Sequence, residues 1–342
     1  MFVIRPIAAS DHEAFVKLAF EAGLGITSLP KNPPALHNMI EHSERSFAKT
    51  LNKPGEELYL FVLENLQDNT LAGVCGIHAK TGISKPIIFY RIAQTSLYNP
   101  IQKQPIEVPA LKLVHYQDAP TEICSLFLSR AARHSGLGRL LSLSRFLFIA
   151  SFLDRFDKMV FADMRGVVEH NHDCLFWEGI AQHFVNMDYA SFLEVKHAQD
   201  ISIHEALPQT PIYIPLLPYA VQNTIGKVHE NTKPALNMLM QEGFTISDDI
   251  SIYDGGPKIE AETREIHTVK ASQVATVKSI TAPTEDSVAF LIANTSIHYR
   301  CCYGTLLLDE EQKASLTPQT AAALHVNPGD QIRFISHERL HP

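Results

Sequence analysis

The sequence of 342 residues has few cysteines, and no two of them form a C-x-x-C pair. Disulfide-framed domains and common cysteine-based zinc sites need a higher density or a closer spacing, so the sequence argues against both. We expect free, mostly buried thiols in a cytoplasmic protein. The five cysteines are Cys75, Cys124, Cys174, Cys301 and Cys302.

Long hydrophobic runs and a net positive charge are also absent. The longest apolar stretch, residues 140–152, is too short to cross a bilayer, and Arg145 and three serines interrupt it. Residues 1–6 lack the basic start and the apolar run of a signal peptide. A formal net charge of -8 disfavours binding of nucleic acid through the whole surface. We therefore expect a cytoplasmic protein that binds neither a membrane nor nucleic acid.

Hydrophobic residues make up 45% of the chain and charged residues 19%, which is typical of a globular protein with a sizeable core. The pattern of elements predicts an α+β fold with a mixed sheet flanked by helices. After about residue 261, short apolar runs alternate with turns. We expect a larger domain over residues 1–260, with an insertion near 167–228, and a small β-rich domain over residues 261–342.

Apolar runs and turn residues predict the local elements. Two β-prone runs, residues 59–63 and 71–77, are separated by a polar turn, which is typical of a hairpin. A strand over residues 122–128, a loop, a helix over 137–152 and a strand over 158–164 suggest a crossover unit. The proline-rich region 82–109 has no clear pattern apart from a strand near residues 111–115 that follows it.

The loop between this strand and this helix has the pattern R-x-x-G-x-G, formed by Arg133, Gly136 and Gly138. Glycine-rich loops at a helix N-terminus bind phosphate through backbone N–H groups and the helix dipole. A dinucleotide fingerprint would need a third glycine where Leu141 stands, and no Gly-Lys-Ser/Thr of a Walker A loop follows. The neighbouring cations in this acidic chain are Arg130, Arg133, Arg139 and Arg145.

This loop, following an apolar strand, resembles the acyl-CoA loop of the GNAT acyltransferase superfamily. The resemblance implies a GNAT-like sheet in which the strand before the loop pairs with the pantetheine arm of coenzyme A, as an added strand would. It also implies that a backbone N–H near Leu126, within residues 125–128, faces the thioester carbonyl and stabilises the oxyanion.

Further motifs, found in one order along the chain, resemble the bacterial arginine N-succinyltransferase family. This family moves succinyl from succinyl-CoA to the α-amine of L-arginine, with succinyl-CoA as a co-substrate and no permanently bound cofactor. The motifs are residues 29–30 (LP), 124–128 (CSLFL), 164–167 (MRGV), 176–178 (FWE), 211–213 (PIY), 225–229 (IGKVH) and 253–257 (YDGGP).

The resemblance implies roles for two residues. His229 matches the catalytic proton donor, and Leu126 matches a leucine that contacts succinyl-CoA. The chain departs from the family pattern at residues 168–171 (VEHN) and 174–177 (CLFW), which bear on the acceptor side. The resemblance leaves open a homo-oligomer or a heteromer with a similar subunit.

His229 suits the proton transfer that amide formation requires, because an imidazole titrates near neutral pH. A helix is expected to begin near Asn231, and its N-terminus should disfavour the imidazolium. We hypothesise that His229 carries a proton between the attacking amine and the sulfur of coenzyme A. The spacing of His170, His172 and Asp173 is not that of a common zinc motif, so no metal site is predicted.

An arginine acceptor needs carboxylates for its guanidinium and a cation for its carboxylate. The candidates are Asp163, Glu169, Asp254 and Arg165.

Two alternatives stay open on the sequence. One is a related acyl-CoA N-acyltransferase that acts on ornithine or another amine, including one that transfers acetyl. The other is a non-catalytic scaffold that binds coenzyme A. The intact loop and His229 favour an enzyme, since a non-catalytic relative could lose either.

Overall fold

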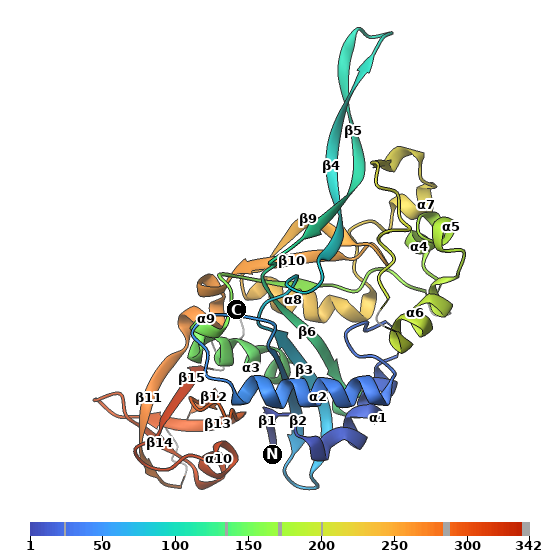
Figure 1. The fold of residues 1–342 in the computed structure, drawn as a ribbon. Coiled ribbons are helices and arrows are strands. Elements are labelled where there is room, and N and C mark those ends of the chain that lie inside the picture. The colour runs from blue at the N-terminus through green and yellow to red at the C-terminus, as the bar shows by residue number, and fades with distance from the viewer. Residues whose placement is uncertain (24, 134–135, 170–172, 200, 283–287, 337–342) are drawn as a thin grey trace.

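The computed structural model describes residues 1–23, 25–133, 136–169, 173–199, 201–282 and 288–336. Within them, fifteen strands form one mixed sheet that helices flank, so the expected α+β fold is confirmed (Figure 1). The strands lie in the order β12-β15-β11-β14-β13-β1-β2-β3-β6-β7-β10-β9-β4-β5-β8.

The strands are β1 (Phe2–Pro6), β2 (Leu58–Asn65), β3 (Thr70–His78), β4 (Ile87–Asn99), β5 (Gln104–Tyr116), β6 (Thr121–Leu128), β7 (Met159–Asp163), β8 (Ile212–Tyr213), β9 (Thr245–Ser251), β10 (Pro257–Glu262), β11 (Gln273–Ile280), β12 (Val288–Asn294), β13 (Cys301–Leu308), β14 (Ala314–Leu316) and β15 (Gln331–Ser336). The helices are α1 (His12–Ala22), α2 (Pro33–Ala48), α3 (Leu137–Ser151), α4 (Leu175–Gly179), α5 (Gln182–Val185), α6 (Tyr189–Ala198), α7 (Tyr219–Gln222), α8 (Lys233–Gln241), α9 (His267–Ala271) and α10 (Pro318–Leu324).

The hairpin of β2 and β3 lies in the middle of the sheet, as its two apolar runs predicted. Successive side chains of a strand point to opposite faces, and β2 is buried on both. Leu58, Leu60 and Val62 pack in the cluster that includes residues of α1 and α2. Tyr59, Phe61 and Leu63 pack in the cluster that includes α3. The continuous apolar run is therefore the signature of a strand covered by helices on both sides.

The predicted crossover unit is confirmed: β6 and β7 are parallel, and α3 connects them. The two strands pair only at their start, where Thr121 lies opposite Val160 and Glu122 opposite Phe161. Beyond Glu122, β6 stays paired with β3 on its other side. The separation of β6 from β7 opens the sheet on one side of β6.

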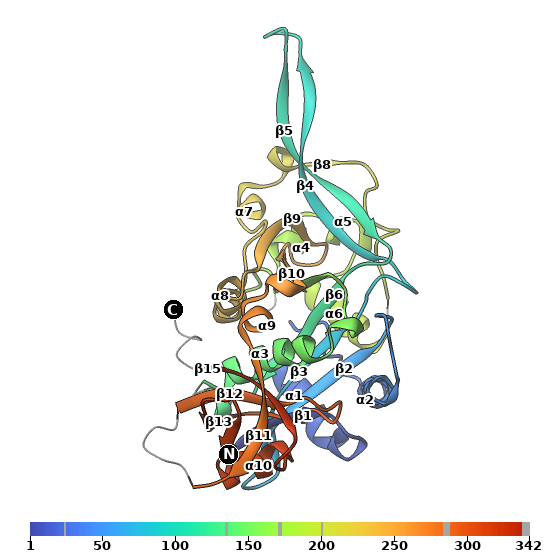
Figure 2. The same cartoon turned by 90° about the vertical axis from the view of Figure 1, so that its left-hand side faces the viewer.

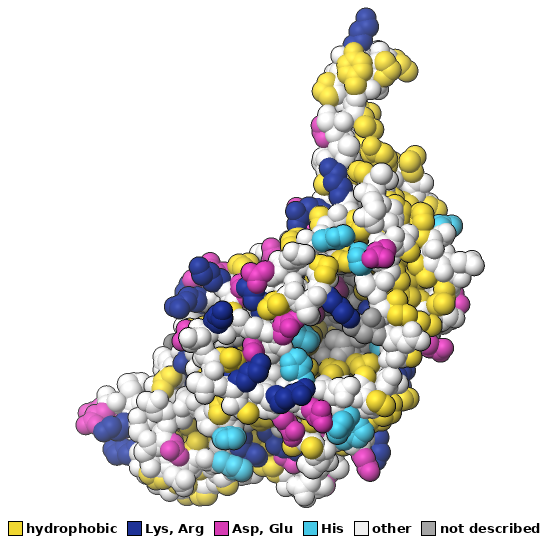
Figure 3. Space-filling view, in the orientation of Figure 1, with side chains coloured by type: hydrophobic (Ala, Val, Ile, Leu, Met, Phe, Trp, Pro, Cys, Tyr) yellow, Lys and Arg dark blue, Asp and Glu magenta, His cyan; other side chains and the backbone are white. Residues whose placement is uncertain are grey.

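The proline-rich region is a long arm formed by β4 and β5, which projects from the body (Figures 1 and 2). Pro105 and Pro109 lie in β5, whose outer edge pairs, among the described residues, only with the two residues of β8. A proline removes no ladder hydrogen bond where its nitrogen faces the open edge of a strand, and an edge strand such as β5 offers such positions. Apolar side chains cover much of the arm (Figure 3), and Tyr98 and Ile101 are 68% and 90% exposed.

The segment expected as an insertion, residues 167–228, contains α4 to α7 and packs around Trp177. The indole N–H of Trp177 donates to the carbonyl oxygen of Met187 at 2.8 Å, and its ring stacks on Phe192 at 4.3 Å. Tyr90 and Leu111, at the base of the arm, complete this cluster.

The C-terminal region is rich in strands, as expected, and also contains α10, which the sequence analysis did not foresee. Strands β11 to β15 form a closed ring, because β12 pairs with both β15 and β13. The hydroxyl of Tyr299 in this region donates to the carbonyl oxygen of Ser144 in α3 at 2.7 Å. The boundary expected between residues 260 and 261 falls inside β10, and the division into two domains stays a prediction.

Across the part of the chain that the structure describes, no helix combines the length and the apolar character needed to cross a membrane.

Candidate functional site

A cleft with a volume of about 1080 Å³ opens where β6 and β7 separate. Its walls come from β6, the first turns of α3, the end of β7 and the start of α8, together with residues 25–28. These segments are far apart in the sequence and meet only because the two parallel strands diverge. The cleft is therefore a product of the sheet topology.

A β-bulge marks the middle of β6, where it faces the cleft. Val74 pairs with Phe127 and Gly76 with Cys124, so β6 has one more residue than β3 between these pairs. Ser125 has a positive φ of 53°, which is unusual for a residue other than glycine. Its N–H donates to Oγ of Ser28 at 3.0 Å and its hydroxyl to the carbonyl oxygen of Ser28 at 3.1 Å. The bulge is thus held in place by a neighbouring segment, as bulges beside active sites often are.

The predicted phosphate loop lies at one end of this cleft. Gly136 is the N-cap of α3 and has a left-handed φ of 74°, which glycine adopts without strain. Nε of Arg133 donates to the carbonyl oxygen of Leu128 at 3.1 Å, which ties the loop to the end of β6. Gly138 and Arg139 also line the cleft. The N-terminus of α3 therefore faces the cleft together with two arginines.

The sequence suggested that Arg145 belongs to one cluster of arginines around the loop, but the structure places it further along α3. It lies two turns beyond Gly138 in α3 and is only 2% exposed. It nevertheless lines the inner wall of the cleft.

Three motifs that contain glycine, residues 164–167, 225–229 and 253–257, meet beside the cleft and place His229 there. The N–H of Gly166 donates to Oδ2 of Asp254 at 2.8 Å, and the N–H of Gly256 donates to Oδ1 at 3.0 Å. A Cβ at Gly166 would lie 2.2 Å from the carbonyl oxygen of Asp254. Since backbone atoms fill the space, only glycine allows this approach. The N–H of His229 then donates to the carbonyl oxygen of Arg165 at 3.0 Å, so the histidine is fixed to the end of β7.

The imidazole of His229 has a defined tautomer. Nδ1 accepts the backbone N–H of Asn231 at 3.0 Å. A backbone N–H can only donate, so the neutral ring carries its proton on Nε2. Protonation of Nδ1 would break this hydrogen bond. The segment before α8 therefore contacts His229 through one specific hydrogen bond, and its expected effect on the imidazolium stays a prediction.

Two carboxyl groups face the cleft beside the bulge, Glu122 of β6 and Asp163 of β7. Neither side chain has a hydrogen-bonding or ion-pairing partner among the described residues. Burial raises the pKa of Glu122 to about 7. Asp163 is accessible from the cleft, but protein surrounds its carboxyl group, and burial followed by repulsion from Asp254 and Glu122 raises its pKa well above its ordinary range.

Arg165 supplies a positive charge on the same wall of the cleft. Its Nε is buried and has no hydrogen-bond acceptor in the described part of the chain. A Cβ at Gly25 would lie 2.2 Å from the guanidinium carbon of Arg165, so the glycine leaves room for this side chain.

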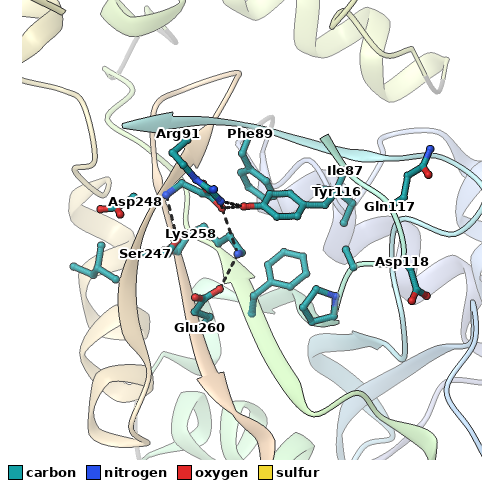
Figure 4. A pocket seen from close by; sticks show the side chains of 15 residues that line it. Ile87, Phe89, Arg91, Tyr116, Gln117, Asp118, Ser247, Asp248, Lys258 and Glu260 are labelled. Atoms are coloured by element: carbon teal, nitrogen blue, oxygen red, sulfur yellow. Dashed lines mark hydrogen bonds and ion pairs between the residues drawn. The ribbon is translucent and has the colours of Figure 1, made fainter. Parts of the chain in front are cut away.

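A second cavity of about 590 Å³ lies between the base of the arm and strands β9 and β10 (Figure 4). Its two cations, Arg91 and Lys258, are both paired with carboxylates that line the same cavity. Nε of Arg91 donates to Oδ1 of Asp249 at 2.9 Å, and Nζ of Lys258 donates to Oε2 of Glu260 at 2.7 Å. Lys258 also lies over the ring of Tyr116, 5.2 Å from its centre. These contacts join strands β4, β5, β9 and β10.

All the residues predicted from the sequence to form the site line the cleft, and their roles stay predictions. They are Leu126, Arg133, Gly136, Gly138 and His229. The acceptor candidates Asp163, Glu169, Asp254 and Arg165 line it as well. His134, His170 and His172 lie outside the described residues. Glu122 was expected only as the start of the strand before the loop, and Arg145 only as one of the arginines around the loop, so neither had an individual role in the prediction.

The geometry thus defines a ligand-binding cleft that combines a phosphate-type loop with charged groups and a histidine. Comparison with known proteins places the chain in a family. The family model described as "Arginine N-succinyltransferase beta subunit" matches residues 2–268, and the model of its C-terminal domain matches residues 273–336.

Individual proteins resemble the chain over nearly its whole length. Arginine N-succinyltransferases of Escherichia coli strains 55989 and K12/DH10B are 34% identical to it, and each alignment covers 98% of this chain and 97% of the relative. The solved structure of arginine/ornithine succinyltransferase subunit AI from Pseudomonas aeruginosa superposes with a TM-score of 0.89 at 29% identity, covering 98% of both chains. The chain belongs to the arginine N-succinyltransferase family, which is a family of acyltransferases.

Proposed function

We propose that this protein is an arginine N-succinyltransferase with a GNAT-like sheet, which moves succinyl from succinyl-CoA to the α-amine of L-arginine. The observation that carries the proposal is the cleft itself. It brings a phosphate-type loop, a bulged strand, His229 and unpartnered carboxyl groups into one space. Family membership supports the reaction, and the chemistry of the cleft supports both substrates.

The donor is assigned to the side of the cleft formed by β6 and α3. The pyrophosphate of succinyl-CoA is an anion, and the N-terminus of α3 with Arg133 suits it. The pantetheine arm would lie along β6, where β7 has separated and leaves the strand without that neighbour. The bulge turns the backbone near Leu126, whose N–H we assign to the thioester oxygen.

The acceptor is assigned to the side formed by the start of β6 and the end of β7. Glu122 is half-buried and Asp163 is accessible from the cleft, and neither has a cation from the described chain as a partner. The surrounding protein raises the pKa of both carboxyl groups, so their negative charges are unfavourable until a cationic ligand arrives. L-arginine carries two cationic groups, and Arg165 offers a partner for its carboxylate.

The reaction forms a C–N bond and breaks the C–S bond of the thioester. The α-amine attacks in its neutral form; as the amide forms, the nitrogen loses one proton and the sulfur of coenzyme A gains one. We assign this transfer to His229, whose Nε2 gives its proton to the sulfur and receives the proton that the nitrogen loses. The contact of Nδ1 with Asn231 leaves Nε2 as the ring nitrogen for this role.

Release of free thiol tests the proposal, with succinyl-CoA and acetyl-CoA as donors and arginine, ornithine and lysine as acceptors. We expect the highest kcat/KM for succinyl-CoA with arginine, and mass spectrometry should find N-succinylarginine. Ornithine is included because the Pseudomonas relative is an arginine/ornithine succinyltransferase subunit. No thiol release with any pair would refute the enzyme, and a preference for acetyl-CoA would refute the assigned donor.

A further inference from the structure

Arg145 is a buried cation without a counter-ion. Its side chain is 2% exposed. Nε donates to the carbonyl oxygen of Ser142 at 3.1 Å and Nη2 to the hydroxyl of Ser142 at 3.0 Å. No carboxylate of the described chain lies within ion-pair distance of the guanidinium.

Such an arrangement is unfavourable unless a ligand completes it. Burial removes the water that stabilises a charge, so buried cations are normally paired with carboxylates. Lys258, which is 6% exposed, follows this rule through Glu260 and Asp249. At Arg145, burial lowers the pKa of the guanidinium, and the thiols of Cys75 and Cys124 are the nearby ionisable groups that oppose this effect.

The position of Arg145 connects it to the donor side of the cleft. Gly138, Leu141 and Arg145 are spaced three and four residues apart, so they lie on one face of α3, and all three line the cleft. Seven residues of helix place Arg145 about 10 Å further in than Gly138. There its charge opposes the rise that burial causes in the pKa of the thiol of Cys124, the residue just before the bulge. A ligand whose phosphates lie at the start of α3 therefore extends towards Arg145.

We propose that Arg145 binds the free carboxylate of the succinyl group and so selects succinyl-CoA over neutral acyl-CoA donors. The inference rests on the proposed function and identifies the residue that recognises its donor. Succinyl differs from butyryl, an acyl group with the same number of carbons, by the terminal carboxylate in place of a methyl group. A guanidinium shielded from water distinguishes these two groups strongly, because only the carboxylate compensates its charge.

The test compares donors in Arg145→Met, with L-arginine as the acceptor. We expect kcat/KM for succinyl-CoA to fall roughly 100-fold, because one partner of a buried charge pair is removed. For butyryl-CoA we expect a change of less than about threefold, because a hydrophobic side chain suits a methyl group. Arg145→Lys keeps the charge and should retain part of the preference for succinyl-CoA.

Arg333→Met is the matched control. Arg333 is a half-buried arginine that donates to the hydroxyls of Ser151 and Ser272, each at 3.0 Å, and it does not line the cleft. Its replacement should leave unchanged the ratio of kcat/KM for succinyl-CoA to kcat/KM for butyryl-CoA.

An equal fall in kcat/KM for succinyl-CoA and butyryl-CoA in Arg145→Met, or no fall for either, would overturn the proposal. Arg145→Gln keeps a donor for Ser142 and loses the charge, so it replaces the Met variant if that variant does not fold. Calorimetric binding of succinyl-CoA and butyryl-CoA provides a second readout. If the wild-type protein transferred no succinyl group, the proposed function would fail. The preference in binding, and its loss in the variants, would still decide the role of Arg145.

Discussion

The two cavities of this protein differ in how their charges are satisfied. In the cavity at the base of the arm, Arg91 and Lys258 are paired with carboxylates of neighbouring strands (Figure 4). In the cleft between β6 and β7, Glu122, Asp163 and Arg145 have no charged partner in the described chain. Charges that pair within the chain hold strands together. Charges that face a cleft unpaired are stabilised when a ligand of opposite charge binds.

Replacement of His229 should have the largest effect. We expect His229→Ala to lower kcat about 1,000-fold while KM for both substrates changes little, because a proton-transferring group contributes mainly in the transition state. Steady-state kinetics checks this, with circular dichroism to confirm the fold. His298→Ala, at an exposed position in the C-terminal region, is the control. A kcat close to that of the wild type would remove His229 from the mechanism.

Two Asp-to-Asn variants compare the cavities directly. Asp163→Asn should lower kcat/KM for L-arginine roughly 100-fold, because the cationic acceptor loses a charged partner in the cleft. L-citrulline is nearly isosteric with arginine but uncharged in its side chain, and its slow turnover should change little. The free energy of unfolding should not fall, because Asp163 has no partner in the described chain to lose.

Asp249→Asn should show the opposite behaviour. Asp249 is 2% exposed and binds Arg91, and Lys258 lies 3.5 Å away. Its neutralisation should lower the free energy of unfolding by about 2 kcal/mol, because Arg91 loses its anion and Lys258 keeps only Glu260. Chemical denaturation measures this, and kcat/KM should be preserved. If Asp249→Asn reduced activity and Asp163→Asn reduced stability, the contrast between the cavities would be wrong.

The glycine junction should be sensitive to a single methyl group. Gly166→Ala should lower the free energy of unfolding by about 1–3 kcal/mol, because the new Cβ overlaps backbone atoms that cannot move aside. Gly138→Ala is the comparison for stability, since its Cβ would have its nearest contact at 3.8 Å, with Leu128. Alanine in a helix should make this variant slightly more stable. Equal melting temperatures for the two variants would contradict the close packing at Gly166.

The smallest effect should be a pH dependence of stability that originates at Glu122. Burial raises its pKa in the folded state from 4.5 to about 7. The folded protein then binds a proton that the unfolded chain releases, so this contribution is complete below pH 4.5 and is lost as the pH rises towards 7. Denaturation between pH 5 and 8, roughly spanning that window, should show a smaller decline for Glu122→Gln than for the wild type. Parallel curves would mean that Glu122 titrates normally.

Local patterns predicted the elements that depend on neighbouring residues. The strand 122–128, the glycine loop and the helix from residue 137 were readable because apolar runs and glycines determine them locally. The bulge was not, because the positive φ of Ser125 depends on contacts with Ser28, 97 residues away. The arm was hidden because Pro105 and Pro109 normally argue against a strand, and only the missing neighbour on that edge permits them.

The site residues were predictable from the sequence in the same uneven way. His229 was found through the order of motifs, whereas its fixed tautomer depends on the contact between Nδ1 and Asn231. Arg145 was expected only as one of the arginines around the loop and as an interruption of an apolar stretch. Whether such an arginine has a carboxylate partner is decided by strands that lie elsewhere in the sequence, so only the structure shows that it has none among the described residues.

The central claim is that the unpaired charges of the cleft bind the charged groups of both substrates. The most direct measurement is kcat/KM of the wild-type protein for succinyl-CoA and butyryl-CoA, each with L-arginine and L-citrulline. The account predicts that succinyl-CoA with arginine is preferred by roughly 100-fold or more over the pairs in which one substrate lacks its charge. Similar values for all four pairs would contradict it.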